Sequence, residues 1–129
     1  MTDRREELLA LTDKFVDAFN RMDLDDVVSF FSEDAVYEDS SGGIHLGHKA
    51  IRTAFEPLVG GARGTIRFDG EDVFAEVETG KVLASWRLNL EKDGDVSVIR
   101  GIDVLEFQGN KLAKKLAYMK VDKPHLETD

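Results

Sequence analysis

The spacing of apolar residues changes once along the chain, near Gly64. Before that point apolar residues recur three or four positions apart, as in helices, and after it they alternate with polar residues, as in strands. Turn signals at Thr79-Gly80, Asp93-Gly94 and Gly109-Asn110 divide the second half into four runs, which predicts β-hairpins. Helices followed by a meander of long strands predict an α+β fold, with the helices packed on one side of an antiparallel sheet.

Three helices are expected in the first half. The first begins at Asp3 and the second at Asp23, because aspartate is a strong helix N-cap. The third runs from His48 to about Glu56 and ends at Pro57 and the glycines that follow, since these residues stop helices.

Six strands are expected, two short and four long. The last one is ambiguous, because Leu112, Leu116 and Met119 would also suit one face of a helix. All 129 residues are taken as one domain with a loose tail from Lys123 to Asp129. The expected strands are Ala35–Asp39, Ile44–Leu46, Thr65–Val77, Lys81–Glu91, Asp95–Phe107 and Lys111–Val121.

Charge and composition narrow the class of protein. The chain has 17 Lys and Arg against 26 Asp and Glu, a formal net charge of −9, whereas binding to nucleic acid or anionic lipid needs a basic surface. It has no cysteine, which excludes disulfides, thiolate metal sites and thiol nucleophiles. The acidic N-terminus is unlike a targeting peptide and the apolar runs are too short for a membrane span, so a cytoplasmic protein is expected.

Asp103 is a carboxylate at a position where the pattern predicts an apolar residue. On its strand it shares a face with Ile99 and Leu105. Burial disfavours a charged carboxylate, so one interpretation is a neutral acid that donates a hydrogen bond or a proton. The other is a structural acid paired with an arginine, for which the candidates are Arg67, Arg87 and Arg100.

Asp39 ends a short strand just before a glycine turn, on the same face as Tyr37. It is either a turn residue or a general base at the mouth of a pocket. Two carboxylates, one neutral and one ionised, are a common arrangement for acid and base chemistry near pH 7. His45 and His48 also fit a two-histidine, one-carboxylate metal site, but they are expected on different elements. We therefore predict no metal and place His45 at the pocket rim.

Aromatic residues on the predicted apolar faces would form either a core or the wall of a cavity. Trp86 alternates with apolar residues on its strand, and Phe15, Phe19, Phe31 and Phe55 are assigned to helical apolar faces. Packing in a core is the default for such residues, but in a curved sheet the same face lines a cavity. The chain has no P-loop, HExxH or GxSxG motif and no GxGxxG after a strand, so no cofactor is expected.

Several segments together resemble a known family. They are Phe15–Phe19, Asp23–Asp25, Phe31–Asp39, Gly47–Ile51, Gly101–Phe107, Lys111-Leu112 and Ala117-Tyr118. In these the chain resembles nuclear transport factor 2-like proteins, specifically the SnoaL-like and Δ5-3-ketosteroid isomerase-like branch. The resemblance implies a cone-shaped, curved antiparallel sheet wrapped around three N-terminal helices, with a deep apolar pocket. It also implies that the last segment is a strand and that the protein is a homodimer.

Within that branch the site residues are most similar to those of the isomerase. By resemblance, Asp39 falls on the general base and Asp103 on the protonated acid of the oxyanion hole. The substrate-binding positions that the resemblance and the aromatic pattern give are Phe15, Phe19, Phe31, Phe55, Trp86, Ile99, Ala117 and Met119.

Three tyrosines of the isomerase family fall on Phe15, Phe31 and Phe55. Loss of one oxyanion-hole donor typically lowers a rate by roughly 10²–10³-fold, which counts against a fast ketosteroid isomerase. The expected function is cofactor-free proton transfer on a hydrophobic, steroid- or polyketide-like carbonyl compound, with Asp39 as base and neutral Asp103 as oxyanion donor. The alternatives are a SnoaL-like polyketide cyclase, a non-catalytic protein that binds a hydrophobic ligand, and a module that binds a protein partner.

Overall fold

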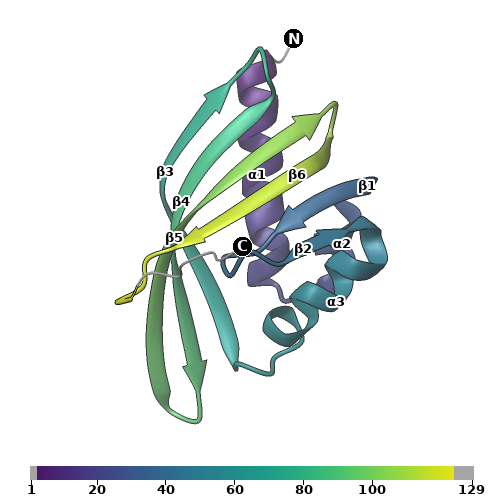
Figure 1. Ribbon diagram of the computed structural model, residues 1–129. Helices are drawn as coiled ribbons and strands as arrows, with labels where there is room; N and C mark the ends of the chain where they lie inside the picture. The colour runs from purple at the N-terminus through teal and green to yellow at the C-terminus, as the bar shows by residue number, and fades with distance from the viewer. Residues whose placement is uncertain (1–2, 124–129) are drawn as a thin grey trace.

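The computed structural model describes residues 3–123 (Figure 1). The loose tail predicted for residues 123–129 therefore lies outside the described residues, except for its first residue. Within residues 3–123 no helix is long and apolar enough to cross a membrane. The helices are α1 (Arg4–Asn20), α2 (Leu24–Ser29) and α3 (Gly47–Val59), and the strands are β1 (Phe31–Glu38), β2 (Ile44–Leu46), β3 (Thr65–Glu76), β4 (Lys81–Lys92), β5 (Asp95–Gln108) and β6 (Lys111–Met119).

The strands form one sheet in the order β2-β1-β6-β5-β4-β3. β3 to β6 pair as an antiparallel meander, as the three turn signals predict. One pair departs from the expected antiparallel sheet, because β1 lies parallel to β6, with Glu38 opposite Leu116. Parallel neighbours need a long crossover connection, and the chain between β1 and β6 provides it. Patterns of neighbouring residues carry no information about such a distant pair.

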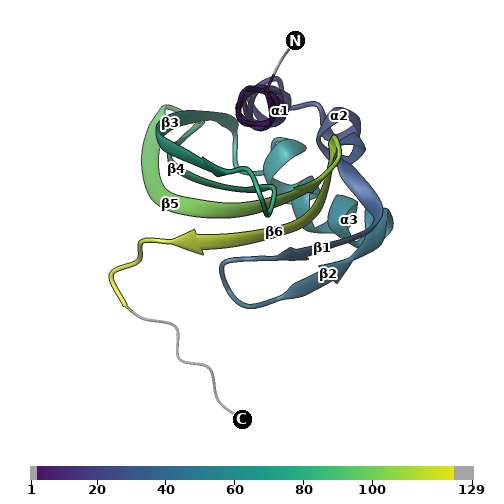
Figure 2. The ribbon, with the colours of Figure 1, turned by 90° about the horizontal axis from the view of Figure 1, so that it is seen from above.

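The sheet curves around α1 and α3, so the helices occupy its concave side (Figure 2). α1 packs against β3, and α3 packs against β1 and α2. The register of β3 shifts between Gly70 and Val73, and that of β5 with β6 between Glu106 and Phe107. Such bulges bend a strand and increase its twist, which helps to close the sheet into the expected cone.

Individual residues determine where α1 and α2 begin and where α3 ends. Asp3 and Asp23 cap α1 and α2 as predicted, each accepting a backbone N–H three residues on at 2.8 and 3.1 Å. α3 passes through Pro57, where the sequence predicted its end, and continues to Val59. Proline removes one backbone donor, but its fixed φ is helical. The helix stops at the following glycines, where Gly61 has a φ of 93°.

Small residues surround Asp103 on the inner face of the sheet. Asp103 on β5 lies opposite Ala84 on β4 and Ala117 on β6, and Gly101 lies opposite Trp86. A side chain at position 101 would not fit, because a Cβ there would lie 2.5 Å from the Trp86 ring. These short side chains leave space between the sheet and the helices.

Candidate functional site

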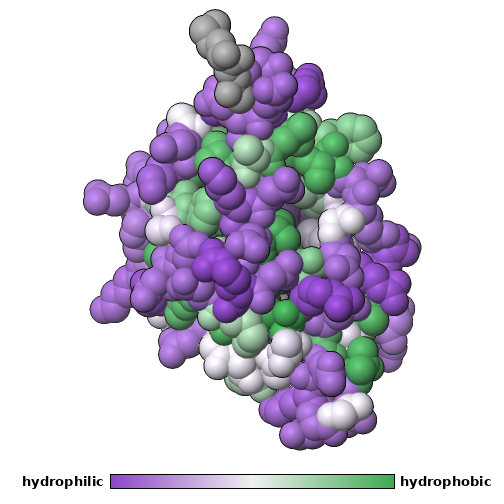
Figure 3. Space-filling model, turned by 180° about the vertical axis from the view of Figure 1, so that it is seen from behind, coloured by the Kyte–Doolittle hydropathy of each residue, from purple (hydrophilic) through white to green (hydrophobic). Residues whose placement is uncertain are grey.

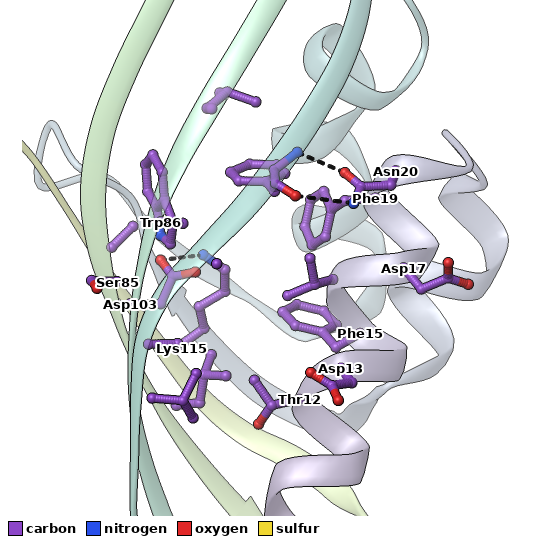
Figure 4. Close-up of a pocket in the computed structure, with 18 of the residues that line it drawn as sticks. Thr12, Asp13, Phe15, Asp17, Phe19, Asn20, Ser85, Trp86, Asp103 and Lys115 are labelled. Carbon is purple, nitrogen blue, oxygen red and sulfur yellow. Dashed lines mark hydrogen bonds and ion pairs between the residues drawn. The ribbon is translucent and has the colours of Figure 1, made fainter.

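A cavity of about 340 Å³ lies between α1, α3 and the inner face of the sheet (Figure 4). Exposed residues on α1 and β3, among them Asp13 and Val73, belong to its lining, so it opens to solvent between these two elements. The surface seen from behind Figure 1 is mostly polar, with apolar side chains showing between the polar ones (Figure 3). The volume lies at the small end of the roughly 300–1,000 Å³ that is usual for small-molecule pockets.

Most of the predicted site residues line this cavity: Phe15, Phe19, Phe55, Trp86, Asp103, Ala117 and Met119. Phe31, Ile99 and Asp39 are not among the lining residues. Phe31 was predicted on a helical face but begins strand β1. It is fully buried in the core, where its ring meets that of Phe15 at a centroid distance of 5.6 Å. Ile99 packs against the edge of the core.

Asp103 forms a buried ion pair with Lys115 on the cavity wall. The Nζ of Lys115 donates to Oδ1 of Asp103 at 2.9 Å, and their side chains are 6% and 14% exposed, respectively. The expected alternative was an arginine partner, but Arg67 and Arg100 pair with Asp69 and Glu71 instead. Asp103 therefore has a cationic partner, as the structural interpretation predicts, but that partner is a lysine. The role of Asp103 as a neutral oxyanion donor stays a prediction.

Lys115 lines the cavity but is not among the residues predicted from the sequence. Its Nζ lies 5.1 Å from the ring centroid of Tyr37 and 5.7 Å from that of Phe55, so two aromatic faces also stabilise its charge. Lys115 is two residues from Ala117, and strand residues two apart share a face. Since the resemblance placed Ala117 in the pocket, that spacing was a signal that could have identified Lys115.

Tyr37 connects the ion pair to the end of β1. Its ring stacks on Phe55, at a centroid distance of 4.5 Å, and on His45, at 5.4 Å. Burial raises the pKa of the Tyr37 phenol, and the charges of Asp103 and Asp39 raise it further. The phenol therefore remains protonated at neutral pH and can act as a hydrogen-bond donor, although the sequence predicted no role for it.

Asp39 lies in the turn after β1 and holds that turn together. Its Oδ1 accepts the backbone N–H groups of Ser41 and Gly43, both at 2.9 Å, and its Oδ2 lies 2.8 Å from Nε2 of His45. Partial burial alone would raise the pKa of Asp39, but the hydrogen bonds from His45, Gly43 and Ser41 outweigh it and lower the pKa. These contacts favour the turn interpretation, and the role of Asp39 as a base stays a prediction.

The two histidines do not converge on a metal site. Nε2 of His48 lies 2.7 Å from the carbonyl oxygen of Phe31, whereas His45 pairs with Asp39. Within residues 3–123 no group of three or more histidine or carboxylate side chains is arranged to hold a metal ion.

Trp86 has a buried polar atom without a partner. Of the buried side-chain nitrogen and oxygen atoms in residues 3–123, its Nε1 alone lacks a hydrogen-bond partner. Figure 4 shows Trp86 beside Asp103 on the sheet side of the cavity. The site thus combines one ion pair with the donors of Trp86 and Tyr37 in an otherwise mainly apolar wall.

A cone-shaped sheet around helices, with a cavity on its concave side, is the nuclear transport factor 2-like fold. The chain belongs to the family of SnoaL-like domains, whose family model matches residues 12–115. No curated protein matches the sequence.

Solved structures of the same fold match nearly the whole chain at low identity. One is Bal32a from a soil-derived mobile gene cassette, with 21% identity, a TM-score of 0.76 and coverage of 91% of this chain and 92% of that one. A second is TerC co-crystallized with polyporic acid, with 14% identity, a TM-score of 0.73 and coverage of 88% and 92%. A third is the epoxide hydrolase/cyclase-like enzyme SalBIII of pyran ring formation in polyether salinomycin, with 16% identity, a TM-score of 0.78 and coverage of 89% and 92%. At these identities the likeness establishes the fold.

Proposed function

We propose that the cavity binds a small, hydrophobic, uncharged carbonyl compound and that the protein catalyses proton transfer next to the carbonyl without a cofactor. The observation that carries this proposal is the buried Asp103–Lys115 ion pair on a mainly apolar cavity wall. The apolar wall suits the carbon skeleton of a steroid- or polyketide-like ligand. The pair is neutral as a unit, so it favours an uncharged polar group over a free anion or cation.

The chemistry follows from the two charges. A carboxylate can accept a proton from the carbon next to a carbonyl group, and the negative charge that develops on the carbonyl oxygen then needs a donor. An ammonium group has three N–H donors, of which Lys115 gives one to Asp103. We assign Asp103 as the base and Lys115 as the group that stabilises the oxyanion.

This assignment differs from the one that the resemblance implies. There Asp39 is the base and a neutral Asp103 is the oxyanion donor. Asp39 is not a lining residue. Its Oδ1 is engaged by backbone N–H groups of its turn, and its Oδ2 by His45 on β2. Moving the base to Asp103 uses a carboxylate that lines the cavity, and it leaves Asp39 as the residue that fixes the turn beside Tyr37.

The reaction that follows proton abstraction depends on the ligand. Return of the proton to another carbon gives an isomerase, whereas attack of the carbanion on a second carbonyl gives a ring closure. Membership of the family of SnoaL-like domains, for which a polyketide cyclase is the alternative that the sequence predicts, supports ring closure. The phenylalanines at Phe15 and Phe55, where the isomerase family has tyrosines, support the same choice.

Deuterium exchange at the carbon next to a ketone tests the proposal. The ketone 2-tetralone, an uncharged bicyclic compound with acidic α-protons, is incubated with the protein in D₂O and followed by NMR. We expect exchange above the buffer rate, with saturation at high ketone concentration. Saturable binding without accelerated exchange would instead support a non-catalytic ligand-binding protein.

We also propose that a second copy of the chain covers the outer face of the sheet. Ile102 on β5 and Tyr118 on β6 are paired neighbours on that face and are 38% and 56% exposed. Adjacent exposed apolar side chains of this kind mark interaction surfaces. Light scattering should show a dimer that Ile102→Glu dissociates, whereas Leu46→Glu on the edge strand β2 should leave it intact; a monomeric native protein would contradict the proposal.

A further inference from the structure

Trp86 is held rigidly at the cavity wall. Its residue exposure is 7%, and its ring lies against the backbone at Gly101, where no side chain would fit. On another side the ring of Phe68 meets it edge to face, with a centroid distance of 5.2 Å and an interplanar angle of 88°. The indole is therefore fixed by packing and does not depend on a hydrogen bond for its orientation.

The indole N–H is unsatisfied in this fixed position. Buried polar side-chain atoms nearly always have partners, and an exception in a native protein needs an explanation. Lys115 donates to Oδ1 of Asp103, and no acceptor in residues 3–123 makes a hydrogen bond with Nε1 of Trp86. An indole nitrogen can only donate, so the missing partner is an acceptor atom.

A ligand in the cavity can provide that acceptor. Trp86, Asp103 and Lys115 all line the same cavity, and Trp86 is on the strand next to Asp103, two residues from its direct neighbour Ala84. An oxygen placed at Nε1 would therefore lie on the same part of the wall as the ion pair. An unfilled donor of this kind rejects ligands without an acceptor, since it stays unpaired when they bind.

We propose that Nε1 of Trp86 donates a hydrogen bond to the carbonyl oxygen of the ligand and so selects oxygen-bearing ligands over hydrocarbons of the same shape. This inference rests on the proposed function for the identity of the ligand. When Asp103 takes the α-proton, the C–H electron pair forms the carbon–carbon double bond of the enolate and the charge moves to the oxygen. Trp86 and Lys115 then both donate to that oxygen, and the return of the proton from Asp103 to carbon restores the pair.

The indole resonance of the native protein provides the first test. The chain has a single tryptophan, so its side-chain N–H gives one ¹H–¹⁵N signal. Two probes are titrated: 2-tetralone, which carries the carbonyl oxygen, and tetralin, which has the same carbon skeleton without it. We expect the indole proton to move downfield with 2-tetralone and to stay nearly unchanged with tetralin. An upfield proton that neither probe moves would show that the N–H points at the Phe68 ring, and would overturn the inference.

Binding to variants provides the second test, measured by calorimetry. Trp86→Phe keeps an aromatic ring but removes the donor, and it should weaken 2-tetralone binding about tenfold while changing tetralin binding less than about twofold. Phe68→Leu is the matched control, because it loosens the packing and keeps the N–H. It should weaken both probes by similar factors. Equal losses for both probes in Trp86→Phe would also overturn the inference.

The two proposals fail in different ways. A downfield indole shift with no deuterium exchange would leave the hydrogen bond intact and refute catalysis. Exchange with an unmoved indole signal would leave catalysis intact and refute the role of Trp86. If 2-tetralone does not bind at all, both are refuted for uncharged ketones.

Discussion

Removal of the Lys115 ammonium should strongly destabilise the protein. In Lys115→Met, Asp103 would remain on the cavity wall without its cation. Breaking a buried ion pair from one side costs about 3–5 kcal/mol. Both side chains are largely buried, but the cavity opens to solvent and water can reach the vacated position. We therefore expect the lower end of that range, about 3 kcal/mol, which corresponds to a decrease in Tm of roughly 10 °C.

Urea unfolding followed by the fluorescence of Trp86, with circular dichroism as a second probe, measures this loss. Lys114→Met is the matched control, because the neighbouring lysine is exposed and its loss should change stability by less than about 0.5 kcal/mol. The double variant Asp103→Leu/Lys115→Met replaces the pair with apolar side chains. It should recover most of the lost stability, since such replacements of buried pairs are often neutral or stabilising.

Two results would refute the reasoning. If Lys115→Met and Lys114→Met lose equally little stability, the ion pair is not buried as described. If the double variant is as unstable as Lys115→Met, the loss comes from the packing of the lysine chain and not from an uncompensated carboxylate.

Three further predictions concern the pH dependence of stability and the packing around the cavity. The folded-state pKa of Asp39 is lowered, so its stabilisation is complete above the unfolded pKa of about 3.9 and is lost as pH falls through the folded value. The stability difference between native protein and Asp39→Asn in urea unfolding should therefore stay constant above about pH 4 and shrink as the pH falls below it, and a difference that does not shrink there would contradict this. The folded-state pKa of Tyr37 is raised, so its stabilisation is complete below the unfolded pKa of about 10 and is lost above it. The difference in free energy of unfolding between native protein and Tyr37→Phe should shrink as pH rises above that value. A difference that grows there would contradict the raised pKa of Tyr37. Gly101→Ala should cost about 1–3 kcal/mol and shift the Trp86 emission, because its Cβ would lie 2.5 Å from the ring. At Gly70 a Cβ would meet nothing within 4 Å, and equal losses in Gly101→Ala and Gly70→Ala would contradict the packing described.

The parts of the fold that depend on neighbouring residues were predictable. The N-caps at Asp3 and Asp23 and the hairpin turns all formed, because each is determined by a few adjacent residues. The last segment, ambiguous by pattern, was settled by the family resemblance, and it is a strand. The parallel pairing of β1 with β6 was missed, because it joins residues about 80 positions apart and no local pattern specifies it.

The site was predictable only in part for the same reason. The burial of Asp103 follows from its place among apolar neighbours on one strand. Its partner Lys115 depends on the register between β5 and β6, in which the shift near Phe107 interrupts the simple alternation. The unpaired N–H of Trp86 is a property of three-dimensional packing, so no sequence pattern could have shown it.

The rate of deuterium exchange into 2-tetralone in two single variants tests the central claim most directly. If Asp103 is the base, Asp103→Asn should lower the protein-catalysed rate by roughly 10²–10⁴-fold, the usual contribution of a general base. Asp39→Asn should then keep most of the native rate, since Asp39 holds its own turn outside the cavity lining. The reverse result, a fully active Asp103→Asn and an inactive Asp39→Asn, would contradict the account and restore the roles that the resemblance implies.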